Sequence, residues 1–160
     1  MVVSKGSTPL QALGYYIPFI TSFINNMRKI EREMIQAIID NKDFSKANTR
    51  VEYEGTYFNI YLHGHKIAVY YPNSMHLHLN NCGYETNTTK SRLNALIDFV
   101  FGGVGNGIFQ RNFNWYMVRD GQQSEFPCNQ WVAVWLVKVR FDSSPRHQGF
   151  NPVIVHLIIN

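Results

Sequence analysis

The segment Thr88-Thr89-Lys90-Ser91-Arg92 holds the residue types best suited to bind a phosphate. A helix predicted over Lys90–Phe101 begins within this segment, with one of the two threonines as its N-cap. The first turn of a helix offers unbonded N–H groups and the positive end of the helix dipole, and the hydroxyls and two cations would add to both. We interpret Arg92 as exposed beside Lys90. One alternative is an ordinary capped helix whose Lys and Arg side chains face water. Another is that Arg92 pairs with Glu85 or another carboxylate and fixes the loop before the helix.

A second candidate site is one face of a predicted antiparallel sheet. The apolar alternation predicts strands over Tyr57–Leu62, Lys66–Tyr71 and Met75–Asn80, with turns at Gly64-His65 and at Pro72-Asn73-Ser74. The expected register places three pairs on an apolar face: Leu62 with Ile67, Ile60 with Val69, and Phe58 with Tyr71.

The opposite face of that sheet is then polar and aromatic. Exposed aromatic side chains on a sheet can stack on bases, although the signature of an RNA-recognition sheet is absent. The alternative is that the N-terminal helix or the C-terminal strands cover this face. Its expected residues are Asn59, Tyr61, Tyr70, His76 and His78, with His63 and Lys66 at one end.

Metal binding and catalysis are both disfavoured by the motifs. His63, His65, His76, His78 and Cys82 cluster in the sequence, but none has zinc-finger spacing and no carboxylate shares their strands, so we predict neither a metal nor another cofactor.

The remaining motifs also fail to predict an enzyme. The glycine-rich run 102–107 follows a helix instead of opening one, which excludes a phosphate loop. His156 lies in an apolar strand, and no Ser, Cys or Asp stands in a nucleophile motif.

Composition and charge narrow the class of protein further. The chain has 160 residues, 45% of them apolar, and a net charge of +4. No apolar run is long enough to cross a membrane, no export signal is visible, and Cys82 and Cys128 are too few for a disulfide framework, so we expect a soluble intracellular protein.

The segment from Gly55 to Arg119 is basic and favours a polyanionic or acidic partner. Its bases are Lys66, Lys90, Arg92, Arg111 and Arg119, against the acids Glu85 and Asp98.

These elements together predict an α+β fold in one domain. Residues 1–45 form a helical arm, in which a long amphipathic helix runs from Pro18 to about Asn41. Residues 48–119 form the antiparallel sheet with its central helix and end in a hairpin of Ile108–Asn112 and Trp115–Arg119. Residues 120–160 contribute two apolar strands, Trp131–Phe141 and Pro152–Ile159.

The middle of the chain resembles an uncharacterised family of small proteins from tailed bacteriophages. The resemblance covers about half of the chain, roughly residues 48–119, and implies a phage source and a location in the host cytoplasm, but no activity. It rests on Asn48-Thr49-Arg50-Val51-Glu52, Tyr61-Leu62-His63-Gly64 with Ile67-Ala68, Gly83-Tyr84, and Thr86–Leu96, and extends to Trp115-Tyr116.

Two classes of function follow from these features. The first is a phage accessory protein that binds nucleic acid through Thr88, Thr89, Lys90, Arg92 and the sheet face, with Lys66 and Arg111 adding charge. The second is a protein that inhibits a host enzyme or a bacterial defence system, for which the long helix and the Arg146-His147 loop offer contacts. A virion component is a third possibility. Unpaired strand edges also predict a homodimer.

Overall fold

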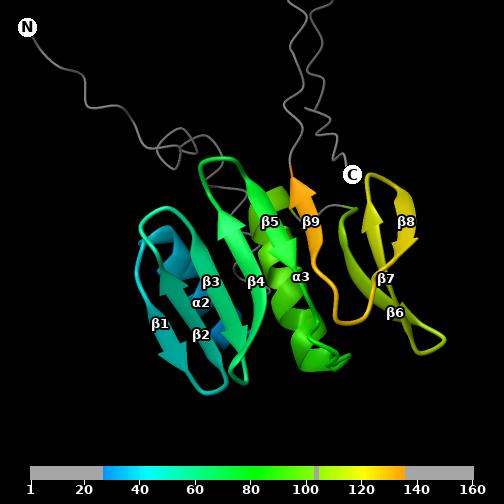
Figure 1. Cartoon of the computed structure of the whole chain (residues 1–160), viewed down its shortest axis with the longest axis horizontal. Coiled ribbons are helices and arrows are strands. Elements are labelled where there is room, and N and C mark those ends of the chain that lie inside the picture. Colours follow the sequence, from blue (N-terminus) through cyan, green and yellow to red (C-terminus); the bar gives the residue numbers. More distant parts are fainter. Residues whose placement is uncertain (1–26, 103–104, 136–160) are drawn as a thin grey trace, which may run out of the picture.

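The computed structural model describes residues 27–102 and 105–135. These residues form two helices, a six-stranded sheet and a three-stranded sheet in which every strand pair is antiparallel, so the predicted α+β class is confirmed (Figure 1). The six-stranded sheet has the order β1 (Phe44–Lys46), β2 (Thr49–Tyr53), β3 (Phe58–Leu62), β4 (His65–Tyr71), β5 (His76–Leu79) and β9 (Val132–Trp135). The three-stranded sheet has the order β6 (Gly107–Arg111), β7 (Asn114–Arg119) and β8 (Gln122–Glu125), and the helices are α2 (Lys29–Ile39) and α3 (Asn87–Phe101).

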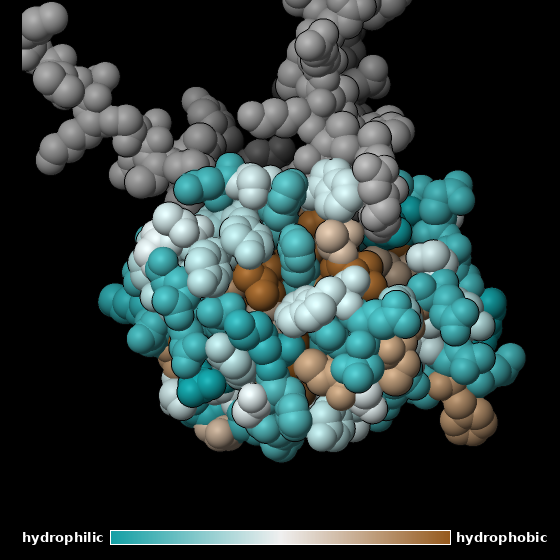
Figure 2. Space-filling model, in the orientation of Figure 1, coloured by the Kyte–Doolittle hydropathy of each residue, from teal (hydrophilic) through white to brown (hydrophobic). Residues whose placement is uncertain are grey.

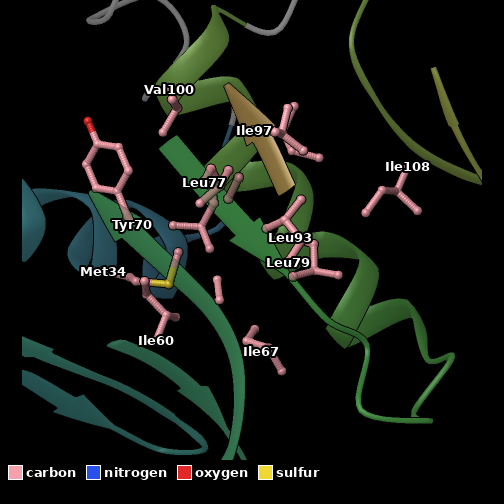
Figure 3. Packing of buried hydrophobic residues seen from close by; sticks show 14 of the residues in the cluster. Met34, Ile60, Ile67, Tyr70, Leu77, Leu79, Leu93, Ile97, Val100 and Ile108 are labelled. Carbon is pink, nitrogen blue, oxygen red and sulfur yellow. The ribbon is translucent and has the colours of Figure 1, made fainter. Parts of the chain in front are cut away.

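Both helices lie on the same face of the six-stranded sheet, behind the strands in Figure 1. Helix α2 packs on β1 and β2, and α3 packs on β4, β5 and β6. The core therefore lies between the helices and this one face. Figure 3 shows Met34 of α2 and Leu93, Ile97 and Val100 of α3 among the sheet residues Ile60, Ile67, Leu77 and Leu79.

The prediction of a long N-terminal helix is wrong. The backbone of Arg28 is extended, with φ −61° and ψ 149°, so α2 begins at Lys29 and has 11 residues. Its length is about 17 Å at the usual rise, instead of the expected length of about 35 Å. Glu31 fixes this start, because its carboxylate accepts the backbone N–H of Arg28 at 3.0 Å. Residues 18–26 of the predicted helix lie outside the described residues.

The predicted pairing of β3 with β4 is wrong by two residues next to the turn and by one residue beyond a bulge. His63 and Gly64 form the turn, both with positive φ, and the pairing starts at Leu62 opposite His65. A bulge then brings Ile60 opposite Ala68 and Phe58 opposite Tyr70. Because side chains alternate between the faces, this shift moves Tyr70 from the polar face into the core.

Helix α3 begins earlier than predicted and ends where predicted. Its N-cap is Thr86, whose hydroxyl accepts the N–H of Thr89, and neither Thr88 nor Thr89 caps the helix. Gly102 ends it in the left-handed conformation, with φ 80°. The side chain of Asn94 holds the second sheet, since its amide exchanges two hydrogen bonds with the backbone of Ile108, at 2.7 and 2.8 Å.

The end of the described chain adds a strand to the large sheet. Strand β9 pairs with β5 and contains part of the predicted strand Trp131–Phe141. Residues 136–160 lie outside the described residues, and with them the rest of that strand, the Arg146-His147 loop, the strand Pro152–Ile159 and His156.

A buried ion pair joins the two helices to the sheet. Arg92 of α3 donates from Nη1 to Oε1 of Glu31 at 2.7 Å, and both side chains are 5% exposed. The same oxygen accepts the hydroxyl of Ser91, while Nε of Arg92 donates to Thr49 of β2 at 3.1 Å. This buried, hydrogen-bonded pair thus connects three separate elements: α2, α3 and β2.

Replacing Arg92 with methionine is expected to destabilise the fold by about 3 to 5 kcal/mol, because the Glu31 carboxylate would stay buried without its partner. Urea denaturation measures the change. The double variant Glu31→Met/Arg92→Met should recover a large part of the loss, since it leaves no unpaired charge. The matched control is Lys46→Met, which breaks the exposed Lys46–Glu33 pair and should change stability far less. Equal effects of Arg92→Met and Lys46→Met would contradict the role given to the buried pair.

The Asp98 carboxylate of α3 should make stability depend on pH. Burial, and secondly the charge of Glu31, raise the pKa of Asp98 to about 6 from an ordinary 3.8. The folded state therefore holds a proton that the unfolded chain has already released, and stability falls as pH rises from about 4 to about 6. Asp98→Asn should flatten this dependence and stabilise the protein near neutral pH by about 1 kcal/mol, after allowance for partial exposure. Denaturation at about pH 4 and about pH 7 tests it, with the exposed Glu54→Gln as the control; equal pH dependence in Asp98→Asn and wild type would contradict it.

Candidate nucleic-acid interface

The face of the six-stranded sheet opposite the helices carries aromatic and cationic side chains, and we call it the outer face. Figure 2 shows this side of the molecule, where apolar patches lie between aromatic and polar residues. The strand registers place these side chains in it: Arg50, Tyr61, Lys66, Val69, Tyr71, His76, His78 and Trp135.

Tyr61 lies between two cations on the outer face. It is opposite Arg50 on β2 and Lys66 on β4, and their charged groups lie 4.3 Å and 5.6 Å from the centre of its ring. Arg50 also pairs with Glu52 at 3.2 Å. Burial and the neighbouring Glu52 carboxylate raise the pKa of Tyr61, so its hydroxyl stays protonated. The arrangement offers a ring for stacking and two cations for phosphates.

Further rings continue across the sheet towards β9. Tyr71 lies 5.4 Å from Tyr57 and 5.6 Å from His78, measured between ring centres, and His76 lies 5.7 Å from Trp135. Burial, and secondly the neighbouring His76, lower the pKa of His78, so this imidazole is neutral at neutral pH. It therefore contributes aromatic surface and not charge.

The structure contradicts most of the phosphate site predicted at the start of α3, because its residues are buried or already paired. Arg92 is buried in its ion pair with Glu31, so its predicted exposure is wrong and the alternative, pairing with another carboxylate, is what the structure shows. Thr89 is buried, and its N–H and hydroxyl are both bonded to Thr86. The ammonium of Lys90 lies 5.9 Å from the ring centre of Trp115, which belongs to the second sheet.

A pocket of about 370 Å³ does lie at this helix start, on the helix side of the sheet. Thr86 and Thr88 lie on one side of it, and the rings of His65 and Tyr84, 4.7 Å apart, lie on another. The backbone N–H groups of the first two helical residues have no carbonyl partner within the helix. The pocket thus has polar groups but no arginine. Its full lining is Leu62, His63, His65, Ile67, Asn81, Tyr84, Thr86, Thr88 and Thr89.

The remaining predicted residues are divided between the core and the second sheet. Tyr70 lies in the core, with its ring against those of Phe58 and Phe99, and burial raises its pKa to about 12 (Figure 3). Arg111 is exposed on β6, with its guanidinium 4.9 Å from the ring centre of Tyr116. The outer face therefore brings together five of the residues predicted for it: Tyr61, Lys66, His76, His78 and Asn59, of which Asn59 is buried.

Four of the outer-face residues named above were not predicted to lie there: Arg50, Val69, Tyr71 and Trp135. Arg50 was missed because β1 and β2 were not predicted, although the alternation of Thr49, Arg50 and Val51 carries a weak strand signal. Val69 and Tyr71 were both placed on the apolar face by the register error. Within residues 27–102 and 105–135, no three His, Cys, Asp or Glu side chains come close enough to hold a metal ion.

Comparison with known proteins gives a family and no activity. The family model described as Kyanoviridae Gp96 protein matches residues 27–133, which is most of the chain. No curated protein and no solved structure shows a significant match. In the part of the chain that the structure describes, no helix is both long and apolar enough to span a membrane. The match confirms the predicted resemblance to a phage family: the chain belongs to the Kyanoviridae Gp96 protein family.

Proposed function

We propose that this phage protein is an accessory protein that binds single-stranded nucleic acid on its outer face. The observation that carries the proposal is the ring of Tyr61 between the cations of Arg50 and Lys66. A base can stack on this ring when the side chains of Arg50 and Lys66 turn away from it towards the phosphates on either side. Single strands fit this surface better than duplexes, because their bases are free to leave their neighbours and lie on a sheet.

Stacking should contribute more to binding than charge. Each stacked base contributes about 1 to 3 kcal/mol, and the outer face has several rings besides Tyr61. Among the described residues its cations are Arg50 and Lys66, and Glu52 offsets part of the charge of Arg50. With two phosphates neutralised, the logarithm of the affinity should fall with the logarithm of salt concentration with a slope of only about −1.4.

The basic middle segment supports the proposal less than its count of charges suggests. Arg92 is neutralised by Glu31, and Arg119 is partly buried. Lys66, Lys90 and Arg111 remain, each with its charged group near an aromatic ring: 5.6 Å from Tyr61, 5.9 Å from Trp115 and 4.9 Å from Tyr116. A function that depended on a dense field of cations would fit this protein poorly.

Tyr61→Ala is expected to weaken binding of a single-stranded oligonucleotide by about tenfold, because it removes one stacking surface. Fluorescence anisotropy with labelled single- and double-stranded DNA and RNA of about 20 nucleotides measures it. Tyr61→Phe keeps the ring and should bind like the wild type, and Gln36→Ala, on the exposed side of α2, controls for a general effect of substitution.

Absence of binding at low salt to all four nucleic acids would remove the proposal. A protein partner that remains bound after nuclease treatment would favour an inhibitor of a host enzyme or defence system, and co-purification with intact particles would favour a virion component. The homodimer stays a prediction, which light scattering can test.

A further inference from the structure

The turn of the β6–β7 hairpin carries a phenylalanine whose side chain is not packed against the rest of the fold. Phe113 is 88% exposed, the highest value among the large hydrophobic residues in the described part of the chain. Asn112 and Phe113 form the turn, with φ of 50° and 66°. This left-handed conformation suits Asn and Gly, and it is unfavourable for a phenylalanine. Neither packing nor backbone geometry therefore accounts for a ring at this position.

The surface beside Phe113 is aromatic and basic. On β6 and β7 the rings of Phe109 and Tyr116 stack with centres 5.5 Å apart, and the guanidinium of Arg111 lies 4.9 Å from the centre of the Tyr116 ring. The span from Gly107 to Arg119 contains no acidic residue. Glu125 of β8, opposite Tyr116, is the acid that the strand pairing brings beside it.

From these contacts we propose that the β6–β7 tip is a second contact for single-stranded nucleic acid, in which Phe113 stacks on a base and Arg111 meets a phosphate. The inference rests on the proposed function and extends it to the second sheet. Arg111 held over a ring keeps guanidinium N–H groups free for phosphate oxygens.

The composition of the tip favours a nucleotide over an apolar pocket on a protein. The residues around the ring are Gln110, Arg111, Asn112 and Asn114, all with side chains that hydrogen-bond, and none is aliphatic. Amide groups can bond to the edges of an unpaired base that stacks on the ring. An anchor for a protein pocket is usually surrounded by further apolar contacts that exclude water, which this tip lacks.

The position of the tip makes the contact depend on strand length. Figure 1 shows the β6–β7 hairpin projecting from the body, on the side of the molecule away from β1 and β2. Tyr61 and Phe113 lie on different sheets, and a strand too short to reach from one to the other cannot occupy both at once. A longer strand can, and its two contacts then reinforce each other through their high effective concentration.

The decisive variant is Phe113→Asn, because Asn fits the left-handed turn and keeps the fold while removing the ring. In anisotropy titrations, we expect it to weaken binding of an oligothymidylate of about 20 nucleotides by about fivefold or more, and to leave that of one of about 6 nucleotides unchanged. Phe113→Trp keeps a stacking surface and should retain the wild-type affinity for the long strand. Thermal unfolding of Phe113→Asn should show no loss of stability.

Two results separate this inference from the proposed function. If Tyr61→Ala weakens binding of both oligonucleotides and Phe113→Asn weakens neither, the second contact is overturned and the proposed function stands. If neither variant changes binding, or no oligonucleotide binds, both are overturned. Equal weakening of the short and long strands by Phe113→Asn would also overturn a separate second contact.

Discussion

The fold depends on the carboxylate of Glu31, where a helix start and a buried ion pair coincide. One of its oxygens accepts the N–H of Arg28 and sets the first turn of α2. The other accepts Arg92 of α3, which in turn donates to Thr49 of β2. Apolar contacts between α2, α3 and the sheet tolerate small displacements, whereas these bonds have fixed directions. Since either charge alone would be costly in the core, all three elements must meet at this point.

This arrangement leaves the outer face free of the two described helices. With α2 and α3 both on one side of the six-stranded sheet, alternation puts half of each strand's side chains on the other side. On β5 the result is plain: Leu77 and Leu79 enter the core, while His76 and His78 lie on the outer face. The chemistry of this surface thus follows from where the ion pair holds the helices.

Local signals predicted the elements well, and relations between elements poorly. The turn at Pro72-Asn73-Ser74, the helix end at Gly102 and the β6–β7 hairpin all carry their own residue patterns, and each was predicted close to its observed place. Strand β8 has the sequence QQSE, which has no apolar residue and therefore no strand signal. The bulge between β3 and β4 depends on how Ile67 and Ala68 both fit the core, and no local pattern reveals it. The one extra residue in this bulge decides whether Tyr70 or Tyr71 lies on the outer face.

The same distinction explains why the candidate residues of the outer face were partly predictable, whereas the burial of Arg92 at the helix start was not. An exposed position on a strand follows from alternation alone, so Tyr61, His76 and His78 were placed correctly. The exposure of Arg92 depended on a carboxylate 61 positions away in the sequence, and charge counted along the chain treats such a residue as free. A cation that is already paired in the core cannot attract a phosphate. The ligand proposed for the outer face would therefore be held mainly by contact with its rings, which act at short range and require the sheet to be folded before they can act.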